Sequence, residues 1–100
     1  MDKNILLTTL NSHDLRELKS QLHHLKPAVV LEGEDLTDQA FHDIDRALDE
    51  SELIKIRTYA NSSEELSHLA EKICTKAKAV LVQTIGYIIA IYRKNLVVEE

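Results

Sequence analysis

Apolar residues recur along this chain with two periods, one typical of helices and the other typical of strands. Leucines at positions 15, 18, 22 and 25 follow the cap residues Asn11 and Ser12 at helical spacing. Pro27 disfavours α geometry in Lys26, so the first helix is predicted to end there. The short β-branched run Ala28–Leu31 then indicates a buried strand.

The middle of the chain repeats this order of helix and strand. Apolar spacing predicts a second helix from about Thr37 to Leu48, which either Asp35 or Thr37 can cap. Polar and apolar residues alternate over Leu53–Tyr59, as expected for a strand whose side chains point to two faces. The alternation places Ile54 and Ile56 on one face of this strand and Leu53, Lys55, Arg57 and Tyr59 on the other.

A third helix and two further strands complete the pattern. Ser62 and Glu65 have the spacing of a capping box, and a buried stripe follows at Leu66, Leu69, Ala70, Ile73 and Ala77. The runs Ala79–Ile85 and Ile88–Tyr92 predict two strands joined at Gly86-Tyr87 as an antiparallel hairpin. The resulting order, α-β-α-β-α-β-β, predicts an α/β fold of the α+β sandwich type. We expect a small mixed four-stranded sheet packed by three helices.

The length and composition indicate one soluble globular domain. We expect an N-terminal arm at residues 1–10, the domain at 11–95 and a C-terminal tail at 96–100. The net charge is −5, but nine of the seventeen acids lie between Glu32 and Glu52, where Arg46 is the one basic residue. The remaining chain carries eleven Lys and Arg against eight Asp and Glu. A basic surface outside the acidic segment is therefore compatible with the composition.

The sequence offers little support for catalysis. Its five histidines show no metal-ligand spacing, and no P-loop, dinucleotide glycine pattern or serine-hydrolase elbow occurs, so we expect no cofactor, metal or small-molecule substrate. The lone Cys74 has no activating motif beside it and is interpreted as a small core residue. The absence of a signal peptide, a membrane-length apolar run and a second cysteine favours the cytoplasm.

Basic residues indicate RNA binding, if the fold gathers them on one surface. The candidates lie on the first helix, the second strand and the end of the chain: Arg16, Lys19, Lys26, Lys55, Arg57, Arg93 and Lys94. Tyr59, Tyr87 and Tyr92 could add stacking groups, although Tyr92 suits the core equally well. The alternatives are an ordinary solvated surface, or a module whose acidic second helix binds a basic protein, for example a ribosomal protein.

The junction between the first strand and the second helix is a second candidate. Gly33 follows the strand and Thr37 precedes the helix, so unpaired N–H groups at this helix start could bind an anion. Glu34 and Asp35 between them would repel a phosphate. We therefore expect the lysines and arginines beside this junction to contribute more to RNA binding than the loop.

Three blocks of the sequence resemble the CRM domain family, whose stand-alone bacterial form is the YhbY-like RNA-binding protein. The blocks are Leu15–Lys26 leading into Pro27–Val30, Leu36–Leu48 followed by Glu52–Ile56, and Val82–Gly86 leading to Ile91–Arg93. They span most of the chain. The family usually has a G-x-x-G loop before Leu-Thr, whereas here Gly33-Glu34-Asp35 precedes Leu36-Thr37 without a second glycine.

The resemblance implies a fold and a partner. The family fold is similar to the order derived above and to the C-terminal domain of bacterial initiation factor three. For stand-alone members, the resemblance implies binding to structured ribosomal RNA in precursors of the large subunit (pre-50S particles) during ribosome assembly. By position it implies an RNA-binding role for Lys26, Gly33, Thr37, Lys55 and Arg93. Tyr92 also matches the family, in a position that suits packing equally well.

Overall fold

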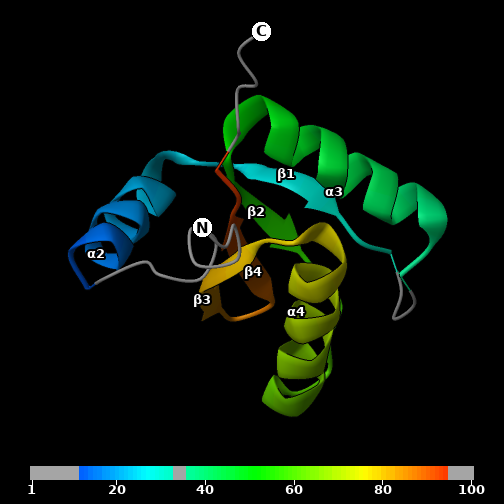
Figure 1. Ribbon diagram of the computed structural model, residues 1–100. Coiled ribbons are helices and arrows are strands. Elements are labelled where there is room, and N and C mark those ends of the chain that lie inside the picture. Colours follow the sequence, from blue (N-terminus) through cyan, green and yellow to red (C-terminus); the bar gives the residue numbers. More distant parts are fainter. Residues whose placement is uncertain (1–11, 33–35, 95–100) are drawn as a thin grey trace, which may run out of the picture.

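The computed structural model describes residues 12–32 and 36–94 of the chain (Figure 1). Its elements, in order, are α2 (Ser12–Gln21), a 3₁₀ turn η1 (Leu22–His24), β1 (Pro27–Val30), α3 (Asp38–Ser51), β2 (Leu53–Arg57), α4 (Ser63–Ala77), β3 (Val80–Ile85) and β4 (Ile88–Tyr92). The predicted α-β-α-β-α-β-β order is confirmed. Several boundaries differ from the predicted ones. The first helix tightens into the 3₁₀ turn before Pro27, and the second continues past Leu48. The first three strands differ from their predicted ranges by one or two residues at an end, and of the β1 residues, which were expected to be buried, only Val29 is. The expected arm, the expected tail and Gly33 lie outside the described residues.

The four strands form one mixed sheet in the order β1-β2-β4-β3. β1 runs parallel to β2, whereas β4 is antiparallel to both β2 and β3. The turn between β3 and β4 needs Gly86, whose φ of 58° lies in the left-handed region that other residues rarely adopt. The last two strands therefore make the predicted hairpin, and the parallel pair requires the crossover that α3 supplies.

The alternation of β2 divides the core into two layers on opposite faces of the sheet. Ile54 and Ile56 belong to the larger core cluster with residues of α3 and α4, including Ile44, Leu48 and Ile73. On the other face, Leu53 packs with Leu18, Leu22, Val82 and Ala90 in a smaller cluster beneath α2. Thus α2 covers one face while α3 and α4 cover the other (Figure 1). Each isoleucine that is completely buried stabilises the fold by roughly 1.5–3 kcal/mol.

Side chains cap both long helices as the sequence predicts. Thr37 Oγ1 accepts a hydrogen bond from Ala40 N at 3.1 Å, and Ser62 Oγ accepts one from Glu65 N at 3.1 Å. The reciprocal bond of the predicted capping box goes one residue further back, because Glu65 Oε1 accepts from Asn61 N at 2.7 Å. These bonds satisfy amide groups that the first turn of a helix leaves without backbone partners.

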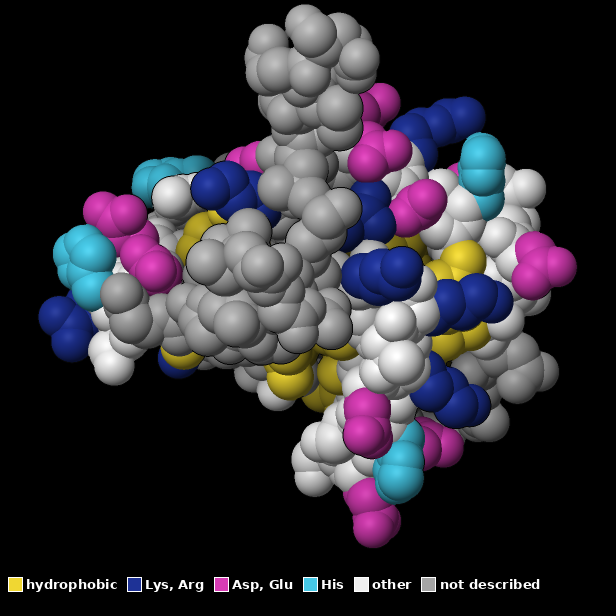
Figure 2. Space-filling model, viewed as in Figure 1, with side chains coloured by type: hydrophobic (Ala, Val, Ile, Leu, Met, Phe, Trp, Pro, Cys, Tyr) yellow, Lys and Arg dark blue, Asp and Glu magenta, His cyan; other side chains and the backbone are white. Residues whose placement is uncertain are grey.

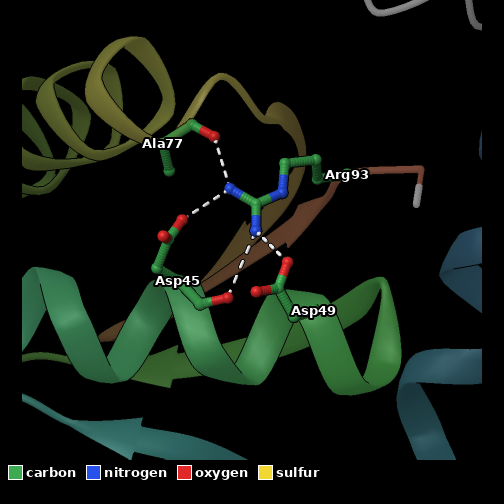
Figure 3. A network of polar contacts seen from close by, with 4 residues as sticks. All are labelled: Asp45, Asp49, Ala77 and Arg93. Atoms are coloured by element: carbon green, nitrogen blue, oxygen red, sulfur yellow. Dashed lines mark hydrogen bonds and ion pairs between the residues drawn. The ribbon is translucent and has the colours of Figure 1, made fainter. Parts of the chain in front are cut away.

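Arg93 connects the end of β4 to α3 and α4. Its guanidinium donates to the carboxylates of Asp45 and Asp49 at 2.7 and 2.9 Å, and to the backbone oxygens of Asp45 and Ala77 (Figure 3). Asp49, near the C-terminal end of α3 where an acid opposes the helix dipole, thus gains a nearby positive charge. No helix among the described residues is both long enough and apolar enough to cross a membrane.

Candidate nucleic-acid interface

A basic groove runs between α2 and the sheet. Its volume is about 330 Å³. It is lined by Arg16, Lys19, Ser20, Leu22, His23, Lys55, Gln83 and Ile85. We call this surface the α2–sheet groove. Its lining includes three of the predicted RNA-binding residues and no carboxylate, although the protein as a whole is acidic. The fold has therefore separated a basic surface from the acids of the α3 region.

Local periodicity positions the two walls of the groove. Leu18 and Leu22 bury the inner stripe of α2, so Arg16 and Lys19 project from its edges toward solvent. On β2, Lys55 lies two residues after the buried Leu53 and therefore points to the same face of the sheet. The cations of the helix and the cation of the strand meet because α2 packs on that face.

Lys55 is held in place by a backbone contact. Its Nζ donates a hydrogen bond of 3.0 Å to the carbonyl oxygen of Leu25, which lies between η1 and β1. The ammonium has two further N–H donors for another acceptor. Lys55 consequently supports the segment that leads into β1 while presenting its charge to the groove.

Two other predicted cations adjoin the groove. Arg57 is exposed and lies two residues beyond Lys55 on the same face, about 7 Å along the strand. Lys26 is exposed and directly follows the carbonyl that Lys55 contacts. Five of the predicted residues therefore lie in the groove, or within two residues of Lys55 or of the carbonyl that it contacts.

The remaining predicted residues are placed differently. Arg93 lies at the α3–α4 side of the sheet, its side chain is only 17% exposed, and the contacts of Figure 3 occupy its guanidinium. Lys94 is exposed beside it. Thr37 is exposed at the start of α3 and uses its hydroxyl as the helix cap. Gly33, with the acids that follow it, lies outside the residues that the structure describes.

A β-bulge adds a residue that sequence reasoning missed. The register between β3 and β4 shifts between Leu81 and Gln83, and Gln83 then pairs with Ala90. Ala90 also pairs with Lys55, so Lys55, Ala90 and Gln83 form one row across three neighbouring strands. Gln83 therefore lies on the same face of the sheet as Lys55. With regular alternation, Gln83 would lie on the opposite face of the sheet from Val82, and no feature of the sequence predicts the bulge. Ser20 was likewise not predicted. His23 follows the helical spacing of the basic edge of the first helix, but it was not among the predicted RNA-binding residues.

Two of the three tyrosines are available for stacking. Tyr59 and Tyr87 are 53% and 60% exposed. Their backbones lie near each other, because the amide and the hydroxyl of Thr58 both donate to the Tyr87 carbonyl at 2.8 Å. Tyr92 instead packs against the small core cluster beneath α2. Burial raises the pKa of Tyr92, and the carboxylates of Glu52 and Asp14 raise it further, so its hydroxyl stays neutral at physiological pH.

The described residues show neither an activated nucleophile at Cys74 nor a group of side chains that could hold a metal ion. Cys74 packs against the larger core cluster, and burial raises the pKa of its thiol to about 11, opposite to what an activated nucleophile requires. Among residues 12–32 and 36–94, no group of three His, Cys, Asp or Glu side chains could hold a metal ion. The basic lining of the groove is compatible with an anionic ligand.

The fold and this groove define a small α+β domain with a basic groove on its surface. The chain belongs to the CRS1/YhbY (CRM) domain family, whose model matches residues 10–93. The resemblance inferred from the three sequence blocks is therefore confirmed.

Relatives and a solved structure agree with this assignment. An RNA-binding protein of Haemophilus influenzae is 38% identical over 89 residues, covering 89% of this chain and 90% of that protein. A probable RNA-binding protein of Pseudomonas aeruginosa is 33% identical over 86 residues, covering 86% and 83%. The solution structure of a candidate RNA-binding protein from Staphylococcus aureus matches with a TM-score of 0.79 and 28% identity, covering 91% of this chain and 95% of that one.

Proposed function

We propose that this protein is a non-catalytic RNA-binding protein that holds the phosphate backbone of its ligand in the α2–sheet groove. The observation that carries the proposal is the meeting of Arg16 and Lys19 from α2 with Lys55 from β2 in a groove without a lining carboxylate. Phosphate contacts of this kind supply affinity and orientation with little dependence on sequence. The names of the relatives and the family assignment support RNA as the ligand.

The proposed ligand is structured ribosomal RNA in precursors of the large subunit, and the proposed compartment is the cytoplasm. The resemblance to stand-alone YhbY-like proteins motivates the ligand, and the single cysteine of the chain motivates the compartment. An A-form RNA helix presents its backbone and 2′-hydroxyls across a wide minor groove, so a protein can recognise it by shape. Arg16 and Lys19 are three residues apart on one helix edge, with about 4.5 Å of rise between them, and can follow one strand of such a backbone.

The test is co-sedimentation of the full chain with pre-50S particles on sucrose gradients at several salt concentrations. We expect association at low salt that weakens as salt rises, because phosphate neutralisation releases counterions. A protein that stays in the unbound fractions at every salt concentration would contradict the ribosomal part of the proposal. Binding to purified ribosomal RNA, measured separately, tests the RNA part.

A second candidate function uses the acids of α3 to bind a basic protein. The observation in its favour is that the side chains of Asp45 and Asp49 remain 61% and 70% exposed. Arg93 offsets part of their charge, which makes the helix a weaker attractor for a basic partner. A ribosomal partner that stays bound after nuclease treatment would favour this function over direct RNA binding.

A further inference from the structure

A second concave surface lies on the opposite side of the sheet from the α2–sheet groove. This cleft between α3 and α4 has a volume of about 730 Å³. Its lining is Leu36, Phe41, His68, Glu71, Lys72, Thr75 and Lys76. Figure 2 shows Lys and Arg side chains over the junction of α3 and α4, with apolar side chains visible between them. We call this surface the α3–α4 cleft.

The floor of the cleft is apolar. Leu36 and Phe41 are half-buried and line this floor. Phe41 faces α4, and the ammonium of Lys76 lies 4.3 Å from the centroid of its ring. An ammonium at this distance is attracted to the face of the ring, which positions Lys76 at the cleft edge.

The charged residues that line the cleft lie on α4. His68, Lys72 and Lys76 are spaced four residues apart along α4, with a rise of about 6 Å between neighbours. Glu71 is the one carboxylate among the lining residues.

The apolar floor and the mixed charge of the α4 rim favour a peptide as the ligand. A nucleic-acid backbone is uniformly negative, so it would meet Glu71 beside the lysines of α4 and would leave the floor of Leu36 and Phe41 unfilled. A peptide can place each charge separately and can fill the apolar floor with one side chain. A helix with carboxylates at positions i and i+4 repeats every 6 Å, which matches the spacing of Lys72 and Lys76.

We propose that the α3–α4 cleft binds an amphipathic helix of a protein partner, with a bulky apolar residue between Leu36 and Phe41 and an acidic stripe facing Lys72 and Lys76. The cleft and the α2–sheet groove lie on opposite faces of the sheet, so the protein can hold this partner and an anionic polymer at the same time. This site does not depend on the identity of the ligand in the groove. A domain that binds both ligands at once would act as an adaptor between them.

The test is a selection of single-helix peptides from a displayed library against the full chain. We expect the selected peptides to carry Glu or Asp at i and i+4 beside a large apolar residue. Amide chemical shifts should change at Phe41, Lys72 and Thr75, and not at Arg16 or Lys55. The double variant Lys72→Glu, Lys76→Glu should bind a selected synthetic peptide at least about tenfold more weakly, because both ammonium partners are lost. A peptide with its acids replaced by lysines should recover binding to that variant.

The matched control carries the same charge change on the other face. The double variant Arg16→Glu, Lys19→Glu should keep its affinity for the peptide. Failure to select any peptide that binds more tightly than about 100 µM would overturn the proposal. So would peptides that bind outside the cleft, or affinity that the Lys72, Lys76 variant retains. A loss of RNA affinity in that variant as large as in the control would assign the cleft to RNA instead.

Discussion

The guanidinium of Arg93 lies 2.7 Å from the carboxylate of Asp45, a residue 48 positions earlier in the chain. This contact joins the end of the last strand to α3, and the neighbouring bond to the Ala77 carbonyl joins it to α4. A cation that the sequence marks as a candidate for RNA binding is thereby used to hold three elements of the fold together.

Arg93→Ala should lower the free energy of unfolding by about 1–3 kcal/mol, because the Ala77 carbonyl and two carboxylates lose their partner. Thermal or urea denaturation measures this change. Lys94→Ala removes a neighbouring exposed cation and should change stability by less than about 0.5 kcal/mol. If Arg93→Ala weakened RNA binding without loss of stability, Arg93 would instead be a contact residue.

Lys19→Glu should weaken RNA binding about tenfold or more at low salt and should reduce the salt dependence of the affinity, because one phosphate contact becomes a repulsion. Filter binding or fluorescence anisotropy over a salt series measures both quantities. Arg46→Glu makes the same charge change on the exposed surface of α3 and serves as the control. Equal effects of the two variants would mean that only net charge matters and that the groove is not the site.

Thr37→Ala should destabilise the fold by about 0.5–2 kcal/mol, because the amide of Ala40 loses its cap. Thr37→Ser keeps the hydroxyl and should be close to neutral in stability. Comparing the RNA affinity of these two variants tests the role that the family resemblance assigns to Thr37. An affinity loss shared by both variants would point to a contact of the threonine methyl group.

Cys74 should react with iodoacetamide at pH 8 about 100-fold more slowly than an unfolded thiol, because its pKa is raised from 9.0 to about 11. Unfolding in urea should remove this protection. Since the folded state binds the proton more tightly, the contribution of Cys74 to stability is complete below pH 9. It should be lost as the pH rises through 11. Cys74→Ala should flatten that part of the pH profile, and an unchanged profile would assign the alkaline loss to other groups.

Tyr59→Ala and Tyr87→Ala should weaken binding to RNA with unpaired bases by about 1–3 kcal/mol per stacked base, with little effect on a continuous duplex. Electrophoretic mobility shifts with a looped RNA and a matched duplex separate the two cases. Tyrosine-to-phenylalanine variants keep the ring and should keep the affinity. Equal losses on both RNAs would argue against stacking.

Local sequence determined the elements of this protein and one wall of its groove. Apolar spacing and proline define the helices, and the alternation of β2 places Lys55 on the face of Leu53 because successive side chains of a strand point to opposite faces. Thr37 and Ser62 cap their helices through bonds within four residues of sequence. Interactions of this range depend on neighbouring residues, so they can be read from the order of amino acids.

Only the tertiary structure decided which charged residues meet. Packing of α2 on the sheet brings Arg16 and Lys19 to Lys55, whereas packing of α3 against α4 turns Arg93 inward and sets Lys72 and Lys76 around Phe41. The bulge in β3 adds Gln83 to the groove. These contacts join residues far apart in the chain, and they depend on how whole faces pack, which no local pattern specifies.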